Sequence, residues 1–269
     1  MITTVSADPL GDGKSQLTLL EKMGSDIGIV NAARVSFMGE SKGAQADEKL
    51  LQYLYKHQHW TPFRQQVLKF RVKCPLFVAR QWRTHNWAEY EDVQWVFNEQ
   101  SARYVEMPEE FYYSKVRVQA KSNKQGSNTV EDDELNSWWQ EQQNNAVSFA
   151  SDSQEGALGS GVAKELANRL LPQNVYTSFI WTVNLHSLIN FLNLRCDEHA
   201  QWEIRQYANQ VALMLAIEFP WVFRAWQRYK TVVIDTESEF VTTKEAMQER
   251  INEAISQALK DREWGDLHG

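Results

Sequence analysis

Residues 83–104 combine side chains that bind anions with large aromatic side chains. The stretch reads RTHNWAEYEDVQWVFNEQSARY and ends in a Ser-x-Arg pair, Ser101 and Arg103. An arginine fork offers paired donors in one plane, which suits a phosphate group. Ser101 and Arg103 could therefore clamp a phosphate, with Glu99 meeting the ribose or ring of a nucleotide. The alternative, which spacing alone favours, is a capped helix start with a solvated arginine and a merely neutralising Glu99.

A second group of polar side chains interrupts the apolar sequence TVNLHSLINFLNLR. Its members are Asn184, His186, Asn190 and Arg195. His186 and Asn190 are four residues apart, so on a helix they share a face. Buried polar groups need partners, and a polar ligand is one way to supply them. The alternative is hydrogen bonding between segments, with His199 as a satisfied interior histidine. The two groups together indicate a site for an anionic, polar, planar ligand.

Several common chemistries need motifs that this sequence lacks. It has no Walker loop, no G-x-G-x-x-G after a strand, no H-E-x-x-H and no G-x-S-x-G. The six histidines form no convincing metal-binding set. Of the two cysteines, Cys74 and Cys196, the first precedes a proline between a predicted strand and a predicted helix, where a small buried hydrophobe is expected. We therefore expect neither a metal nor a thiol nucleophile.

The hydrophobic pattern predicts the elements that hold these residues. Residues 16–24 favour a short strand, period-two alternation favours a strand over 65–73, and Pro75 then opens a helix. The remaining predicted helices cover Ser25 to Val35, Asp47 to His57, a stretch near Glu134, 162–171, 186–218 up to Pro220, and 243–261. Residues 114–135 are polar and form a variable excursion. Long helices with a few strands between them are typical of an α+β domain.

Composition narrows the class of protein further. The chain is 43% hydrophobic and 12% aromatic, which indicates a globular protein. A formal net charge of -7 argues against a general affinity for nucleic acid or anionic membrane. Two cysteines, no signal peptide and no apolar run of about 18 to 20 residues predict a soluble cytoplasmic protein.

Ordered blocks of the chain resemble the flavin-dependent thymidylate synthases. The family signature R-H-R-x-x-S-x-N-E-x-S-x-R-Y is partly present as His85, Asn98, Glu99, Ser101, Arg103 and Tyr104. Further similar blocks follow in family order: NAARVSF, HWTPF, VKCPLFVARQW, LPQNVYTSFIWTVN and SLINFLNLRCDEHAQWEIRQYA. They cover most of the chain outside the N-terminus, residues 114–160 and the tail, so the resemblance is specific.

This resemblance implies a single α+β catalytic domain over 1–269, with helices packed on an antiparallel sheet. It implies a homotetramer with FAD and dUMP sites where subunits meet. It also implies the reaction, in which methylenetetrahydrofolate gives a one-carbon unit to C5 of dUMP, reduced FAD gives a hydride, and NADPH reduces the flavin. Such enzymes need no cysteine nucleophile.

The resemblance also assigns residues by matching position. The dUMP contacts would be Gln81, Glu99, Ser101, Arg103 and Arg195. Arg195 would be catalytic, because a cation beside the pyrimidine stabilises negative charge on the ring. The FAD contacts would be Ser36, His85, Asn184, His186, Asn190 and His199, with His186 at a position where an arginine is usual.

The chain departs from the family pattern around the flavin. The R-H-R core reads Thr84-His85-Asn86, with Arg83 one place early. An arginine expected before the Leu-Pro pair at 171–172 is replaced by an asparagine, and Arg169 follows that asparagine. A shift of one residue turns a helical side chain by about 100°, so Arg83 and Arg169 compensate only if the backbone adjusts.

An insertion over about 87–96 separates the two halves of the motif. Because these changes reduce the positive charge around the flavin, we expect FAD to bind more weakly or in a different pose. We expect the nucleotide site to be intact. Two alternatives to thymidylate synthesis follow: a related C5 methyl or hydroxymethyl transfer to a pyrimidine nucleotide, and a non-catalytic nucleotide-binding homologue.

Overall fold

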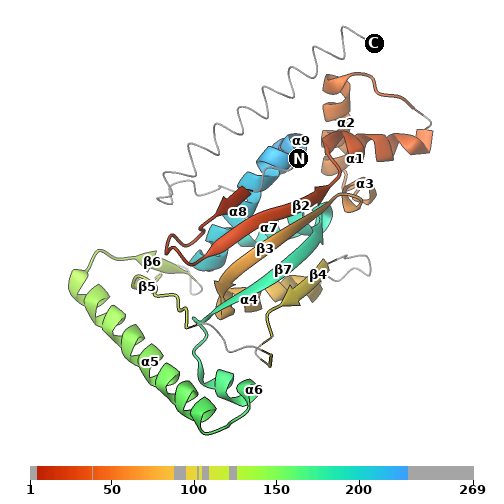
Figure 1. Cartoon of the computed structure of the whole chain (residues 1–269). Helices are drawn as coiled ribbons and strands as arrows, with labels where there is room; N and C mark the ends of the chain where they lie inside the picture. The colour runs from red at the N-terminus through yellow and green to blue at the C-terminus, as the bar shows by residue number, and fades with distance from the viewer. Residues whose placement is uncertain are drawn as a thin grey trace.

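A five-stranded antiparallel sheet forms the centre of the protein (Figure 1). The computed structural model describes residues 5–37, 39–87, 95–101, 103–104, 109–120 and 126–229. The strand order is β1-β2-β3-β7-β4. The bounds of these strands are Val5–Ala7 for β1, Gln16–Met23 for β2, Val67–Pro75 for β3, Tyr176–Asn184 for β7 and Trp95–Glu99 for β4.

The alternation of apolar and polar side chains explains why residues 67–75 form the central strand β3. Leu68, Phe70, Val72 and Cys74 are fully buried, while the residues between them face outward or are partly covered. This is the pattern of a strand with one face on the core. The strand predicted over 65–73 is therefore confirmed, although it begins and ends two residues later.

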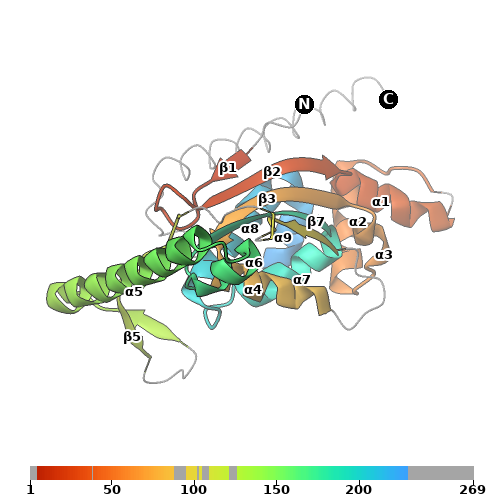
Figure 2. The same ribbon diagram turned by 60° about the horizontal axis from the view of Figure 1, so that its bottom comes forward.

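Helices cover one face of this sheet. Figure 2 shows α4 (Leu76–Arg83), α7 (Leu185–Arg195), α8 (Trp202–Glu218) and α9 (Pro220–Tyr229) together on that side. The other helices are α1 (Asp26–Arg34), α2 (Ala44–Lys56), α3 (Thr61–Arg64), α5 (Asp133–Gly159) and α6 (Lys164–Ala167), and three short 3-10 turns cover Val35–Phe37, Thr84–Trp87 and Asn168–Leu170. The predicted α+β class, with helices packed on an antiparallel sheet, is confirmed.

Some predicted helix boundaries are wrong. The helix expected over 186–218 is two helices, because α7 ends at Arg195 and α8 starts at Trp202. The helical run does end before Pro220 as predicted, since α8 ends at Glu218, and Pro220 then begins α9, where the missing proline N–H is not needed. The helix expected from Asp47 starts at Ala44 instead. The helix predicted over 243–261 lies outside the described residues.

The polar excursion has its own structure. Strands β5 (Arg117–Gln119) and β6 (Ser127–Thr129) form a two-stranded sheet, and the 27-residue helix α5 follows (Figure 1). The predicted insertion at 87–96 overlaps β4 at residues 95–96, and residues 88–94 lie outside the described part.

An aromatic cluster holds α4 and α7 against the sheet. The Trp82 ring stacks on Phe191 with centroids 4.8 Å apart and meets Trp181 of β7 edge-on at 5.1 Å. All three side chains are fully buried. Truncating such a tryptophan typically costs about 3–5 kcal/mol. Trp82 therefore fixes the rotation of α4 and with it the neighbouring polar residues.

Helices α1 and α9 are joined by one buried carboxyl group. Asp26 accepts hydrogen bonds from the backbone N–H groups of Trp221 at 2.9 Å and Val222 at 3.2 Å. It satisfies donors that the first turn of α9 leaves unpaired. Burial raises the pKa of Asp26 to about 7, although the two N–H bonds oppose this shift.

The turn before α1 requires glycine. Gly24 has a φ of 99°, and a methyl group there would overlap with the side-chain oxygen of Gln66. That oxygen accepts a hydrogen bond from the backbone N–H of Ser25 at 3.2 Å, and the Ser25 hydroxyl caps α1. Among the helices that the structure describes, none combines the length and apolar character that a membrane span requires.

Candidate active site

Arg195, at the end of α7, connects α7 to the end of α4. Its Nε donates to Nε2 of His85 at 2.7 Å. Its Nη2 donates to the backbone oxygen of Gln81 at 3.2 Å and to the Thr84 hydroxyl at 2.9 Å. Gln81 and His85 are thus brought together with Arg195, which lies 110 residues beyond His85. The guanidinium plane is fixed by three acceptors.

Burial and the contact with Arg195 determine the protonation state and tautomer of His85. Burial, and then the charge of Arg195, lowers the pKa of His85 to about 4. The imidazole is therefore neutral near pH 7, and because its Nε2 accepts from Arg195, its proton resides on Nδ1. Burial also lowers the pKa of Arg195. A partly desolvated guanidinium of fixed orientation can stabilise charge that develops on a bound ring.

Arg83 and Glu99 form an ion pair beside this cluster. The Arg83 guanidinium also lies over the Phe97 ring, 5.0 Å from its centroid. The Thr177 hydroxyl donates to Oε1 of Glu99 at 2.7 Å. Within one chain, Arg83 therefore neutralises Glu99, as the alternative interpretation of Glu99 expected.

Ser101 and Arg103 lie in a turn. The Ser101 hydroxyl accepts from the backbone N–H of Arg103 at 3.3 Å, and the N–H of Tyr104 donates to the Ser101 carbonyl at 3.1 Å. Residues 103–104 form a turn where the alternative interpretation expected a helix start, so that detail is wrong. The Arg103 side chain is 71% exposed and pairs with Glu165 of α6 at 3.1 Å. A phosphate clamp at Ser101 and Arg103 stays a prediction.

A second cluster lies between α3 and α7. The His186 ring stacks on Trp60, with centroids 4.5 Å apart and planes 16° apart. Asn190 Nδ2 lies 3.4 Å from His186 Nε2, so the shared helix face is confirmed. Arg64 Nε donates to His186 Nδ1 at 3.3 Å. Burial, and then the charge of Arg64, lowers the pKa of His186 to about 4.

Arg64 is a residue that sequence reasoning missed. It brings a guanidinium next to His186, the position where the resemblance described above implies an arginine. The signal was available, because Arg64 directly follows the HWTPF block.

Asn184 caps α7 rather than pointing into a cluster. Its side-chain oxygen accepts from the Ser187 N–H at 2.9 Å, and the residue is 2% exposed. His199 is not an interior histidine, because its side chain is 60% exposed and its Nδ1 lies 2.7 Å from Asp197. Ser36 and Arg169 are exposed.

The residues predicted to bind ligands are thus only partly assembled. In the described ranges, no hydrogen bond or ion pair joins Ser36, Arg103, Arg169 or His199 to the cluster around Arg195 or to the one around His186.

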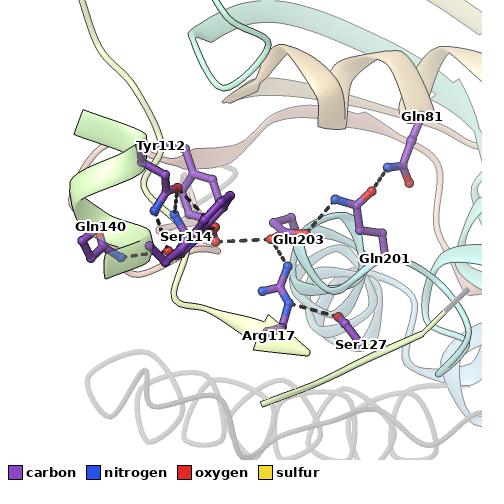
Figure 3. A network of polar contacts seen from close by, with 10 residues as sticks. Gln81, Tyr112, Ser114, Arg117, Ser127, Gln140, Gln201 and Glu203 are labelled. Atoms are coloured by element: carbon purple, nitrogen blue, oxygen red, sulfur yellow. Dashed lines mark hydrogen bonds and ion pairs between the residues drawn. The ribbon is translucent and has the colours of Figure 1, made fainter. Parts of the chain in front are cut away.

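A further polar network starts at Gln81 (Figure 3). Gln81 Nε2 donates to Gln201 Oε1, and Gln201 Nε2 donates to Glu203 Oε2 at 2.9 Å. Glu203 in turn forms an ion pair with Arg117 of β5. Sequence reasoning assigned no role to Gln201, Glu203 or Arg117. These three residues also line a cavity of about 540 Å³ between α5 and the body of the protein.

The cysteines lie away from these polar clusters. Cys74 and Cys196 are both buried and neither forms a disulfide, and burial raises the pKa of the Cys74 thiol well above its usual value. The interpretation of Cys74 as a buried hydrophobe is confirmed. No group of three or more potential metal ligands gathers in the ranges that the structure describes.

Comparison with known proteins adds to this geometry. A family model described as Thymidylate synthase complementing protein matches residues 18–221. A flavin-dependent thymidylate synthase from Thermosipho africanus is 41% identical over 217 residues, covering 80% of this chain and 92% of that protein. One from Wolbachia pipientis wMel is 37% identical over 258 residues, covering 93% and 87%.

A solved structure of known substrate class is also similar. The UMP/dUMP methylase PolB from Streptomyces cacaoi, bound with 5-Br UMP, aligns with a TM-score of 0.71 and 27% identity. The alignment covers 80% of this chain and 95% of that chain.

Proposed function

The chain belongs to the flavin-dependent thymidylate synthase family, and from this we propose that it methylates dUMP at C5 to give dTMP. In this proposal the one-carbon unit comes from methylenetetrahydrofolate, bound FAD supplies the hydride, and NADPH reduces the flavin. Two buried cysteines that form no disulfide support a reducing, cytoplasmic location.

The environment of Arg195 supports this proposal most strongly. Its guanidinium is partly buried and held by His85, Thr84 and the backbone of Gln81. A cation that is already oriented costs little reorganisation when charge develops on a substrate. We propose that Arg195 contacts the pyrimidine and stabilises its negative charge as C5 becomes nucleophilic.

The other polar residues divide between nucleotide and flavin. We propose that Gln81, Glu99, Ser101 and Arg103 bind dUMP, the last two at its phosphate. In this assignment Arg83 leaves Glu99 when the nucleotide binds, because the two are paired in the single chain.

The second cluster fits a flat cofactor rich in hydrogen-bonding groups. His186 is neutral and held flat against Trp60, and Asn190 and Arg64 lie beside it. We propose that this cluster, with Ser36, His85, Asn184 and His199, binds FAD. Arg64 supplies positive charge that the altered R-H-R core lacks.

Assembly would complete the site. Because one chain leaves Ser36, Arg103, Arg169 and His199 apart from both clusters, we propose a homotetramer in which neighbouring subunits bring them together. The acidic net charge supports a small-molecule substrate over a nucleic acid.

Tritium release from C5-labelled dUMP tests the function. We expect release that requires FAD, a reductant and methylenetetrahydrofolate, and a loss of about 100- to 1,000-fold in Arg195→Gln. Arg228→Gln is the matched control, because Arg228 lies on the exposed side of α9 and bonds Gln52. Absence of release from the wild-type chain under these conditions would refute the proposal and favour a non-catalytic nucleotide-binding role.

The similarity to a UMP/dUMP methylase gives a second candidate, C5 transfer to another pyrimidine nucleotide. Mass spectrometry of the product from dUMP and from UMP separates the two, and it also distinguishes a methyl from a hydroxymethyl product.

A further inference from the structure

The network behind Gln81 has a fixed hydrogen-bond direction. Its inner end is Glu203, which is 1% exposed. Glu203 Oε1 accepts from Arg117 Nη2 and lies 3.5 Å from the Tyr112 hydroxyl, while Oε2 faces Gln201. As the partner of a guanidinium, this carboxylate has only acceptor atoms to offer.

The carboxylate fixes the orientation of both glutamine amides. Gln201 must turn its NH₂ group to Glu203, at 2.9 Å, and its oxygen therefore faces outward. Gln81 must then turn its own NH₂ group to that oxygen. The acceptor-only carboxylate therefore decides the orientation of both amide groups.

The outward end of the network is Gln81 Oε1. It accepts no hydrogen bond from any residue in the described ranges, whereas the backbone oxygen of Gln81 is bonded by Arg195. Gln81 is therefore tied to the candidate active site through its main chain and is oriented from behind by Gln201 (Figure 3).

We propose that Gln201, Glu203 and Arg117 are positioning residues that make Gln81 present an acceptor to the nucleotide. The matching ligand group is a neutral O–H or N–H donor of the nucleoside part, a sugar hydroxyl or the ring imide. It is not a phosphate oxygen, which would meet the Gln81 oxygen as a second acceptor. This inference rests on the proposed function, since it names what Gln81 recognises in that site.

The network also gives the polar excursion a role. Arg117 lies on β5, donates to the Ser127 hydroxyl of β6 at 3.2 Å, and lies over the Trp202 ring, 5.3 Å from its centroid. The β5–β6 hairpin thus holds the guanidinium that pairs with Glu203. A surface segment outside the family motif therefore stabilises the orientation of a binding residue.

Reversing the direction of the network tests this inference. Lysine has donors and no acceptor, so in Gln201→Lys the ammonium donates to Glu203 and to the oxygen of Gln81. Gln81 must then turn its NH₂ group to the ligand. Gln201→Glu loses the bond to Glu203, because two carboxylates meet there, but its carboxylate still accepts from the Gln81 NH₂ group and so keeps the orientation of Gln81. Position 201 is exposed, so neither change alters the core.

The measurement is the dissociation constant, by calorimetry with the FAD-loaded full chain, of dUMP and three analogues. The 2′,3′-dideoxy analogue lacks the sugar hydroxyl, 3-methyl-dUMP lacks the imide N–H, and deoxyuridine lacks the phosphate. The wild-type protein is expected to bind one of the first two about tenfold more weakly than dUMP, because the Gln81 acceptor is left unpaired. In Gln201→Lys this ratio falls to about one, and in Gln201→Glu it stays.

Gln227→Lys on α9 is the control for added charge, because Gln227 is exposed and belongs to a different surface. It should keep the wild-type ratio. The inference is overturned if the ratios are equal in the wild-type protein and Gln201→Lys, or if Gln81→Leu weakens dUMP but leaves deoxyuridine binding unchanged. If the wild-type protein neither binds dUMP nor releases tritium, the proposed function itself fails, which is a separate result.

Discussion

Acidification should weaken the fold through His85, and His85→Gln should remove that effect. The folded-state pKa of His85 is about 4, below the value of 6.5 expected in the unfolded chain. His85 therefore binds a proton more weakly in the folded protein than in the unfolded chain. The stability conferred by the neutral imidazole is present above pH 6.5 and is lost as the pH falls toward 4.

The size of this effect follows from proton linkage. For one histidine with these two pKa values, the free energy of unfolding falls by about 2 kcal/mol between pH 7 and pH 5. Glutamine cannot take up a proton, but its side-chain oxygen can still accept from Arg195 Nε. His85→Gln should therefore cost little at pH 7 beyond lost contact with Phe191.

The assay is urea unfolding of both proteins at pH 7 and pH 5, at equal protein concentration. The difference in unfolding free energy between wild type and variant should shift by about 2 kcal/mol in favour of the variant at the lower pH. Other titrating groups are present in both proteins and cancel. If the difference is the same at both pH values, the folded-state pKa of His85 is that of an exposed histidine and the reasoning is refuted.

Three further changes test other parts of the structure. The pKa of Asp26 is raised to about 7, so the neutral carboxyl favours folding at low pH and this benefit is lost as the pH rises through 7. The unfolding free energy of wild type relative to Asp26→Asn should therefore fall between pH 4 and pH 8 in urea unfolding, because asparagine does not titrate, and an unchanged difference would contradict the raised pKa. Gly24→Ala should lower the unfolding free energy by about 2–4 kcal/mol in the same assay, because of its φ of 99° and the overlap with Gln66. Arg64→Gln should weaken FAD binding about tenfold, measured by flavin fluorescence, if the guanidinium beside His186 supplies charge to the cofactor; unchanged affinity would remove Arg64 from the flavin site.

Local features of this fold could be predicted from the sequence. The Ser25 cap and α1 depend on residues within one helical turn, and β3 depends on its own alternation. The His186–Asn190 pair also follows from helical spacing alone. In each case the interaction that decides the structure lies within one helix or strand and the residues next to it.

Features that depend on distant partners could not be predicted in this way. Arg195 and His85 lie 110 residues apart, and no pattern near either one shows that they bond. The break between α7 and α8 was hidden because both helices are buried and apolar on most sides. The pairing of Arg83 with Glu99 depends on how β4 is placed beside β7, which periodicity does not reveal.

The pairing of β3 with β7 joins two strands that the chain visits far apart, since Pro75 is opposite Tyr176 and Val67 is opposite Asn184. Everything between them, including β4, the hairpin and α5, is one long loop closed by this pair. The entropy of closing a loop grows only with the logarithm of its length, so doubling it costs about 0.6 kcal/mol. Changes of length in the intervening segment should therefore affect stability little, but because contacts between distant residues form slowly, the central pair should limit the rate of folding. Insertions in this segment should therefore be tolerated in stability, while the distant pairing of β3 with β7 slows folding.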